Sequence, residues 1–494
     1  MNIALILQMA AETAPGRTGL VCEGQRYSYA ELHRLAAATA VAIQKSGAAY
    51  VALLDENSAA ALVTLFGAAM AGVPYVPLNY RLADADLAAL LGRISPAFAV
   101  GDADRIRRLD AGGAHVTLDR RALLEMARGS GASEPEERNE DTAVQLFTSG
   151  TTGTPKAALL KHGNIMSYIL GTVEFACADE NEASVISVPP YHIAGISALL
   201  SSTYAMRRAV LLPAFEPGAW LRAAHDESVS NAFVVPTMLA RIIDHIEEGN
   251  AGVPPSLKAI AYGGGRMPAE LIRRALDLFP DVDFTNAYGL TETSSTIALL
   301  GPREHREAQT ATDDNIRRRL ASVGLPLPTV EVEIRNEAGH PLPPGEQGEI
   351  YVRGEQVSGQ YRERSALDAD GWFPTRDAGW LDEDGYLYLA GRADDVIVRG
   401  GENISPGEIE DVLTSHESIA DAAAVGIPSE EWGEAVGIAV VVKPGRHQPT
   451  ETELRQLIKT RLRSSRLPER CVFTDELPYN DMGKLLRRDV RRLF

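Results

Sequence analysis

The sequence predicts an α/β protein: a large N-terminal domain of helix-covered β-sheets with a small barrel-like part, then a small α/β C-terminal domain. Near the start of the chain, helices and buried strands alternate, and the predicted segments are Ser28–Gly47, Tyr50–Leu54, Asn57–Ala71 and Tyr75–Leu78. This β-α-β alternation is typical of a sheet covered by helices. Residues 331–389 instead alternate apolar and polar side chains between Gly/Pro turns, which indicates a smaller antiparallel or barrel-like part of the large domain.

The first predicted helix has both a start and a stop signal. Ser28, with Glu31 three positions later, has the pattern of a capping box, and Gly47 follows the last apolar residue of the stripe. The uncharged segment Asn57–Tyr80 has the length of a membrane span, but it is rich in Ala and Gly and contains two prolines. We therefore expect a buried helix and a buried strand there.

The length of the chain and the pattern of its last part predict two domains. A chain of 494 residues is too long for one ordinary core. The pattern of the last part predicts a small α/β unit. It has a helix from Ser405, a strand near Ala422–Gly426, a second strand at Val436–Val442 and a helix from Thr450. We expect a large domain over residues 1–392 and a small domain over residues 393–494.

Composition excludes several classes of partner. Apolar residues make up 45% and charged residues 23% of the chain, as in ordinary globular proteins. The net charge of −19 argues against general binding to nucleic acid or to an anionic membrane, although a local basic pocket is compatible with it. Only Cys22, Cys177 and Cys471 are present, far apart, which indicates reduced thiols in a cytoplasmic protein rather than disulfides or a zinc site.

The segment Phe147–Ala158 has the composition of a phosphate-binding loop. Glycines permit the positive φ angles that let successive backbone N–H groups converge on an anion. The hydroxyl side chains add donors, and Lys156 adds a mobile point charge suited to phosphate. No Gly-Lys-[Ser/Thr] follows the second glycine, so this is not a Walker-type loop. Taken alone, the segment is equally compatible with a polar turn between two apolar runs.

This segment resembles the phosphate loop of the AMP-forming adenylating enzymes, which include acyl-CoA synthetases, peptide-synthetase adenylation domains and luciferases. It departs from the family pattern at Ala157, where glycine is usual. The resemblance implies that the loop binds ATP through Thr148, Ser149, Gly150, Thr151, Thr152, Gly153, Thr154 and Lys156.

A second motif, Pro189-Pro190-Tyr191-His192, matches the Pro-x-x-His pattern of the same family. A lone histidine after prolines is otherwise more often a capping or core residue. The resemblance implies that His192 borders the acyl pocket and contacts the carboxylate region of the acid. Six residues suggest an apolar pocket for an aromatic, alicyclic or short-to-medium aliphatic acid: Ile193, Ala194, Phe233, Val235, Ala287 and Gly289. A dicarboxylic acid would need an additional cation, which the sequence does not place.

Two further segments resemble the nucleotide site of the family. By that resemblance, Gly263, Gly264 and Gly265 form one wall of the adenine slot, where glycine lets the backbone approach a flat ligand. In the segment Asn286–Glu292, an aromatic ring can stack on adenine, a hydroxyl can donate to phosphate and a carboxylate can hold Mg²⁺. We assign these roles to Tyr288, Thr291 and Glu292, with Ala287 and Gly289 as their neighbours in the site.

The ribose site and the domain hinge are also implied by resemblance. Asp377 can accept hydrogen bonds from both ribose hydroxyls, because a carboxylate offers two oxygens. Arg376 stands where the family usually has glycine, and the sequence leaves open whether it narrows the slot or points outward. Arg392 would pair with ribose or phosphate, and Asp394 matches the residue at which relatives hinge.

A lysine near the carboxyl end completes the predicted machinery. The spacing Pro478-x-x-x-x-Gly483-Lys484-x-x-Arg487 matches the catalytic-lysine motif of the family. Without that match, Lys484 would be an ordinary solvated charge. The resemblance implies that Lys484 bridges the carboxylate and the α-phosphate, and that the mobile small domain then rotates to present the Gly400–Ile404 loop to a second substrate.

The resemblance extends over essentially the whole chain, and it implies an AMP-forming ligase that uses ATP, Mg²⁺ and coenzyme A. A carboxylic acid would become an acyl-adenylate with release of pyrophosphate, and the acyl group would pass to coenzyme A. The usual Tyr-Lys-x-Pro appears as Ser465-Arg466-Leu467-Pro468, which keeps a cation but loses the aromatic ring. An amine or a separate carrier protein therefore remains an alternative acceptor, and a homodimer is allowed. A non-catalytic nucleotide-binding protein is the other class, against which His192 and Lys484 argue.

Overall fold

The computed structural model describes residues 1–110, 113, 115–130, 134–138, 140–148, 155–392, 395–400, 402–429, 431–480 and 485–494. Several predicted site residues lie outside this described part, and their roles stay predictions: Ser149, Gly150, Thr151, Thr152, Gly153, Thr154, Asp394 and Lys484.

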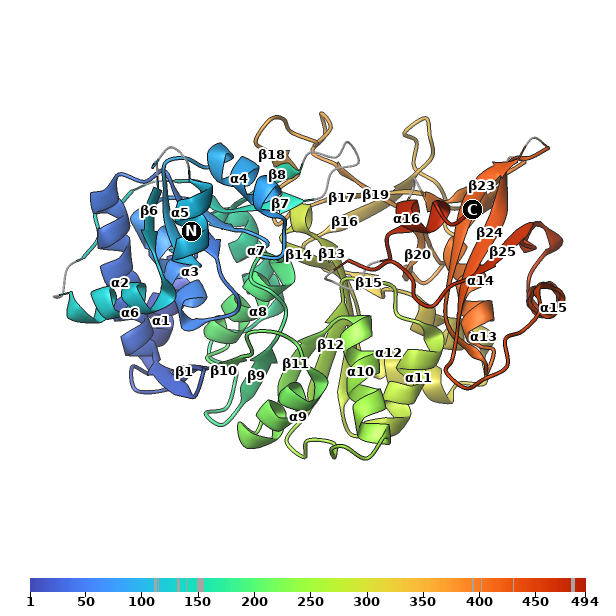
Figure 1. The fold of residues 1–494 in the computed structure, drawn as a ribbon, viewed down its shortest axis with the longest axis horizontal. Coiled ribbons are helices and arrows are strands. Elements are labelled where there is room, and N and C mark those ends of the chain that lie inside the picture. Colours follow the sequence, from blue (N-terminus) through green and yellow to red (C-terminus); the bar gives the residue numbers. More distant parts are fainter. Residues whose placement is uncertain are drawn as a thin grey trace.

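The largest sheet, which we call sheet A, has nine strands in the order β15-β14-β13-β12-β11-β9-β10-β1-β2 (Figure 1). Its central strands are parallel, and its edges become antiparallel at β2 and at β14 and β15. The strands are β1 (Thr18–Cys22), β2 (Gln25–Ser28), β9 (Ala183–Ile186), β10 (Arg208–Leu211), β11 (Asn231–Val234), β12 (Ala259–Gly263), β13 (Asp283–Leu290), β14 (Ser295–Leu300) and β15 (Leu325–Pro326).

The second sheet, sheet B, has seven strands in the order β18-β8-β7-β4-β3-β5-β6. It is parallel except at β8 and β18, which pair antiparallel to their neighbours. The strands are β3 (Tyr50–Leu54), β4 (Tyr75–Pro77), β5 (Ala97–Gly101), β6 (His115–Leu118), β7 (Thr142–Thr148), β8 (Lys156–Lys161) and β18 (Gln360–Tyr361).

Helices cover both sheets, as the alternating sequence pattern predicts. One core cluster combines residues of sheets A and B with residues of the helices α1 (Ala4–Thr13), α2 (Tyr29–Ser46), α3 (Ala59–Ala71), α6 (Arg120–Gly129), α7 (His162–Thr172) and α8 (Ile193–Tyr204). A second core packs sheet A against α9 (Pro217–Asp226), α10 (Pro236–Glu247), α11 (Ala269–Leu278) and α12 (Pro302–Thr310). A third packs sheet B against α4 (Asp84–Arg93) and α5 (Ala103–Leu109).

The part predicted to be antiparallel or barrel-like is sheet C, a four-stranded antiparallel sheet in the order β16-β17-β19-β20. Its strands are β16 (Glu331–Arg335), β17 (Gly348–Arg353), β19 (Phe373–Leu381) and β20 (Leu387–Arg392). The short helix α13 (Asp314–Arg318) precedes it in the chain, in the connection between β14 and β15 of sheet A.

The last part of the chain forms sheet D, which has its own cores and occupies the orange-to-red end of the molecule in Figure 1. Its strands are β21 (Ile397–Arg399), β22 (Glu402–Ile404), β23 (Ile419–Ser429), β24 (Gly433–Val442) and β25 (Arg470–Phe473). The helices are α14 (Pro406–Thr414), α15 (Glu451–Arg461) and α16 (Arg487–Arg491). This separate sheet with its own helices is the predicted small α/β unit.

Local signals account for the boundaries that the sequence predicts best. The Ser28 side chain accepts a hydrogen bond from the Glu31 N–H, and Gly47 ends the helix in the left-handed conformation. The helix predicted at Asn57 begins at Ala59, because Ser58 is its N-cap. The strand before the glycine-rich turn, β12, begins at Ala259 and not at Leu257, because the Leu257 N–H donates to the Pro254 carbonyl oxygen in a turn. Among the described residues, no helix is both long and apolar enough to cross a membrane.

Candidate active site

A cavity of about 1020 Å³ collects most of the described site residues that the sequence predicts. Its walls come from both large sheets, from sheet C and from the last part of the chain. The predicted residues on these walls are Thr148, Lys156, His192, Gly264, Ala287, Gly289, Thr291, Glu292 and Arg392. A pocket of this size can hold a nucleotide together with a small acid.

The phosphate side of the cavity lies at the facing ends of β7 and β8. Thr148 ends β7, Lys156 begins β8, and the two residues are directly paired, so both ends of the predicted phosphate loop meet at the cavity. The Lys156 ammonium lies 5.7 Å from the centre of the Tyr361 ring. Tyr361 comes from β18, which is far away in sequence. It could not be predicted as a site residue, because the pairing of β18 with β8 brings it beside Lys156.

Glu292 is held in place by both its main chain and its side chain. Its carbonyl oxygen accepts hydrogen bonds from the N–H groups of Ser358 and Gly359, at 2.9 and 3.2 Å. The Tyr361 hydroxyl donates to Glu292 Oε1 at 2.7 Å. Burial, followed by the charge of Glu292, raises the pKa of Tyr361, which therefore stays a neutral donor. Glu292 thus presents an oriented carboxylate at the cavity.

This single carboxylate fits Mg²⁺ that arrives with a nucleotide. Mg²⁺ is usually bound by one or two carboxylates together with substrate phosphates and water. The described residues contain no cluster of three or more His, Cys, Asp or Glu side chains that would form an all-protein metal site. Glu292 would therefore share the ion with the phosphates of the substrate.

The predicted adenine wall lies where three strands of sheet A, β12, β13 and β14, approach one another closely. A Cβ atom on Gly263 would lie 2.2 Å from the Ala287 carbonyl oxygen, and one on Gly289 would lie 1.8 Å from the Ser295 carbonyl oxygen. Gly264 has φ +78°, in the region that favours glycine. Gly264 and Ala287 face the large cavity, whereas Gly263 is buried and is not among its described lining residues.

Tyr288, Asp377 and Arg392 form a hydrogen-bonded group beside a second cleft of about 310 Å³. The Tyr288 hydroxyl donates to Asp377 Oδ2 at 2.7 Å, and Arg392 Nε lies 3.1 Å from Asp377 Oδ1. Asp377 and Arg392 are direct partners across β19 and β20. Burial and then the Asp377 charge raise the pKa of Tyr288 well above its ordinary value, so the phenol remains a donor. Gly265 also lines this cleft.

Arg376 points outward at the rim of the large cavity. Its side chain is 67% exposed and its Nε lies 3.7 Å from Glu349 Oε1. Its φ is +63°, in the left-handed region that costs a residue with a Cβ atom. This explains why glycine suits the position in other members of the family. The side chain is mostly exposed, although Arg376 also lines the cavity at its rim.

The side predicted to bind the acid lies around the start of α8. His192 is the N-cap residue of α8, and the centres of its ring and the Tyr191 ring are 4.5 Å apart. Ile193, Ala194 and Phe233 line the cavity as predicted. Val235 does not: it is 1% exposed and belongs to the core between sheet A and its outer helices. The prediction for Val235 was wrong because β11 ends at Val234 and Val235 is already the N-cap residue of α10, so the alternation of the strand does not extend to it.

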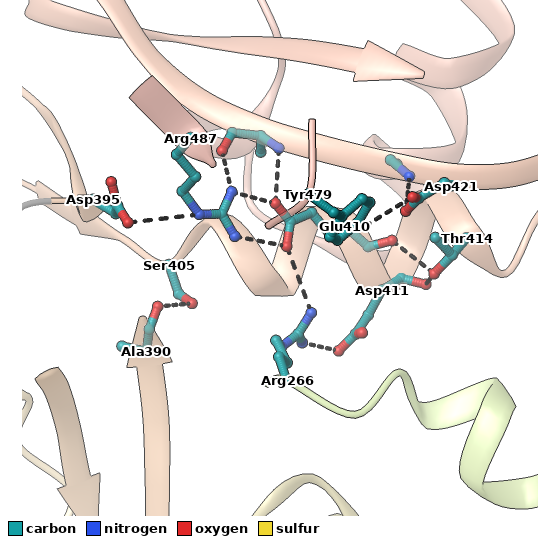
Figure 2. Close-up of polar contacts among 12 residues, drawn as sticks. Arg266, Ala390, Asp395, Ser405, Glu410, Asp411, Thr414, Asp421, Tyr479 and Arg487 are labelled. Carbon is teal, nitrogen blue, oxygen red and sulfur yellow. Dashed lines mark hydrogen bonds and ion pairs between the residues drawn. The ribbon is translucent and has the colours of Figure 1, made fainter. Parts of the chain in front are cut away.

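The small α/β unit meets the large domain through a few polar contacts (Figure 2). Arg266, just after the glycine-rich turn, is ion-paired with Asp411 of α14, and its Nη1 lies 3.8 Å from Glu410 Oε2. The Ser405 hydroxyl donates to the Ala390 carbonyl oxygen at 2.7 Å. Burial raises the pKa of Asp411 even though Arg266 lowers it, so the pairing only partly offsets the loss of hydration.

Inside the small unit, a buried ion pair holds the segment that follows Lys484. Arg487 is bound by the Glu410 carboxylate through both terminal nitrogens, and its Nη1 also donates to the Ala424 carbonyl oxygen (Figure 2). Burial alone would raise the pKa of Glu410, but Arg487 and Arg266 outweigh it and the net shift is downward. On the two sides of Lys484, Asn480 lines the large cavity and Leu485 lines the smaller cleft.

Comparison with known proteins agrees with this arrangement. The family model described as "AMP-binding enzyme" matches residues 7–362, and "AMP-binding enzyme C-terminal domain" matches residues 408–484. A feruloyl-CoA synthase from Amycolatopsis is 33% identical, with 98% of this chain and 97% of the relative covered.

Two solved structures extend the comparison to the whole fold. The o-succinylbenzoate CoA synthetase of Bacillus subtilis, in complex with its acyl-adenylate intermediate, superimposes with a TM-score of 0.84 at 30% identity over 98% of this chain and 97% of its own. The same enzyme has also been solved with ATP and a magnesium ion. The amide bond synthetase McbA of Marinactinospora thermotolerans gives a TM-score of 0.88 at 27% identity, with 99% of each chain covered.

The predicted fold class and the resemblance drawn from the motifs are both confirmed by these matches. The converging motif residues and the full-length similarity lead to one conclusion: the chain belongs to the AMP-binding enzyme family, among its AMP-forming carboxylic acid–CoA ligases.

Proposed function

We propose that the protein converts a carboxylic acid and ATP into an acyl-adenylate and pyrophosphate, and then transfers the acyl group to coenzyme A. The observation that carries this proposal is the convergence of six separated segments on one cavity. The segments are represented by Lys156, His192, Gly264, Glu292, Arg392 and Asn480.

In the first step, a carboxylate oxygen attacks the α-phosphorus of ATP and the bond to pyrophosphate breaks. Both reactants are anions, so the protein must align them and neutralise the charge that develops on the phosphate oxygens. Lys156 and the hydroxyls of Thr148 and Thr291 would hold the phosphates, and the lining of one cavity by all three residues supports this role. Glu292 would hold Mg²⁺, which adds charge neutralisation when it is bound.

The acid and the nucleoside are bound on different walls of the site. His192, at the N-terminus of α8, would contact the carboxylate region. The ring of Tyr288, with Gly263, Gly264 and Gly265, would form the adenine slot. Asp377 would accept hydrogen bonds from the ribose hydroxyls, and Arg392 would pair with the ribose or a phosphate. The ion pair between Asp377 and Arg392 at the edge of the smaller cleft supports the assignment of these two residues.

Lys484 is proposed to bridge the carboxylate and the α-phosphate during adenylation. The described residues Asn480 and Leu485 support this role, because each lines one of the two clefts. We further propose the division into residues 1–392 and 393–494, with Asp394 as the hinge. The sheet that begins at Ile397 supports this division, since it has its own core.

Coenzyme A is the proposed acceptor, with an amine as the second candidate. The thiol would attack the acyl carbon and AMP would leave. Arg466, the cation that replaces the usual lysine, donates to Glu408 at 2.7 Å and is also paired with Glu402. In this arrangement its charge is already neutralised by two carboxylates, which weakens the support that this cation gives to coenzyme A as the acceptor. The likeness to an amide bond synthetase favours an amine as the alternative.

The test incubates the protein with ATP, Mg²⁺ and a library of carboxylic acids, with coenzyme A, amines or neither. Mass spectrometry then identifies adenylate, thioester or amide. A thioester formed faster than any amide supports the proposal. If an amide forms and coenzyme A is left unused, the acceptor is an amine and not coenzyme A. The absence of adenylate across the library would overturn the proposed function.

A further inference from the structure

One buried hydroxyl on the wall of the large cavity has no hydrogen-bond partner. Ser197 is 4% exposed, and its Oγ atom makes no hydrogen bond within the part of the chain that the structure describes. The residue lines the cavity. Because a buried hydroxyl without a partner costs free energy, such a group inside a binding cavity is suited to a partner on the ligand.

The helical repeat explains why this hydroxyl faces the cavity. The face of α8 that lines the cavity carries Ile193, Ala194, Ser197, Ala198 and Ser201. These positions recur at the spacing of one helix face. The intervening residues Ile196, Leu199 and Leu200 are buried in the core between the two large sheets. Ser197 therefore sits one turn along α8 from the predicted carboxylate contact, His192.

The wall around Ser197 is aromatic and uncharged. It includes Tyr168 of α7 and Phe233 of β11, together with small residues such as Ala261 of β12. Among the described cavity-lining residues from Tyr168 to Ala287, none is Lys, Arg, Asp or Glu. The charged lining residues come from other segments, and they are Lys156, Glu292, Arg364, Arg376, Arg392 and Asp395.

We propose that Ser197 is a specificity-determining residue, which selects an aromatic monocarboxylic acid with one neutral hydrogen-bonding substituent on its ring. This inference rests on the proposed function, and it names the class of acid. A serine hydroxyl both donates and accepts, so it can pair with a ring hydroxyl or with an ether oxygen. A second carboxylate in the same place would lose its hydration without meeting a cation, so dicarboxylic acids are disfavoured.

The test measures kcat/KM for adenylation with matched acids: cinnamate, its 2-, 3- and 4-hydroxy forms, their methyl ethers, and forms with a carboxyl group on the ring. The wild-type protein should prefer one hydroxy or methoxy acid over cinnamate and should use the dicarboxylates least. Ser197→Ala should lose about five- to tenfold on the preferred acid and stay within about twofold on cinnamate, as expected for one hydrogen bond. Ser197→Cys, similar in size with a weaker donor, should fall between the two.

Ser202→Ala is the matched control. Ser202 lies on the same helix and is also 4% exposed, but it is not among the described residues of the cavity wall. It should leave the preference between the acids unchanged. The role of Ser197 would be overturned if Ser197→Ala and Ser197→Cys lost kcat/KM equally on cinnamate and on its substituted forms. A preference of the wild-type protein for a dicarboxylate would also overturn it. Absence of adenylation with every acid of this panel would overturn this inference, whereas absence of adenylate across the broad acid library would overturn the proposed function as well.

Discussion

The two sides of the candidate active site are built differently. On the large-domain side, the cavity residues stand at strand ends whose close packing leaves no room for a Cβ atom at Gly263 or Gly289. On the small-domain side, the described polar contacts to the large domain include the ion pairs of Arg266 and the hydrogen bond from Ser405. The first side is held by continuous packing, and the second by these polar contacts and by a small apolar cluster of Val396 with Ala378 and Ala390.

The ion pairs of the small domain show the same contrast at a finer scale. The pair across the seam is partly exposed, with the Arg266 and Asp411 side chains at 42% and 32%. The pair inside the small domain is buried, with Glu410 and Arg487 at 9% and 14%. Exposed pairs contribute little, whereas breaking a buried pair is costly. The difference indicates that the buried pair stabilises the interior of the small domain, whereas the exposed pair contributes little to its attachment to the large domain.

The largest expected effect comes from breaking the buried pair. Glu410→Gln should destabilise the small domain by about 3–5 kcal/mol, because Arg487 keeps its charge without its partner. The pKa of Glu410 is lowered from its ordinary value of 4.5, so its contribution is fully present above that pH and is lost as the pH falls through the lowered pKa. Chemical denaturation should therefore show a gap between variant and wild type that is constant near pH 7 and shrinks below about pH 4.5. A gap that widens toward acid would contradict this assignment.

The next effect concerns the lysine that the small domain is proposed to supply. Lys484→Ala should slow adenylate formation by about 10²–10³-fold, the size expected for a group that stabilises charge in the transition state. Transfer from a preformed adenylate should change far less. Single-turnover measurements of the two half-reactions separate these outcomes.

Arg488→Ala is the control for Lys484, since the Arg488 side chain is 76% exposed and lies four positions further along the chain. It should leave both half-reactions near the wild-type rate. Equal loss of both steps in Lys484→Ala would remove the proposed role of the lysine.

A smaller effect is expected on the large-domain side, at Arg376. Arg376→Gly should raise the free energy of unfolding by about 1 kcal/mol, because glycine adopts a positive φ without the penalty of a Cβ atom. Arg376→Ala keeps that penalty and should give no such gain. Thermal unfolding of the two variants compares them directly, and an equal change in both would show that the backbone conformation is not the cause.

The smallest effect is expected from the exposed pair across the seam. Arg266→Gln should slow adenylation about two- to fivefold and leave thioester formation unchanged or faster, because the arrangement that brings Asn480 and Leu485 beside the two clefts loses a weak contact. Arg303→Gln is the control, because the Arg303 side chain is 77% exposed and is paired with Glu304 and Glu307 of its own helix. A loss of both steps, or a large loss of stability, would mean that the contact is structural rather than separable.

The sequence predicts best what is set by neighbouring residues. The helix that starts after Ser28 and ends at Gly47 is an example, because its caps are local. The resemblance of short motifs also predicts His192, Thr291 and Glu292, each of which lines the cavity.

The residues that could not be predicted from the sequence are brought to the site by contacts between distant segments. Tyr361 meets Glu292 only because β18 pairs with β8, and Arg266 meets Asp411 only across two domains. Ser197 has a signal in the sequence, namely its place on the same helix face as Ile193 and Ala194. That signal can be used only once the face is known to line a cavity.

The most direct test of the whole account is acid-dependent exchange of labelled pyrophosphate into ATP by the purified protein. The account predicts exchange only when a suitable aromatic monocarboxylic acid is present, with AMP as the nucleotide product once coenzyme A is added. No exchange across a broad panel of acids, or release of ADP and phosphate in place of AMP and pyrophosphate, would contradict it.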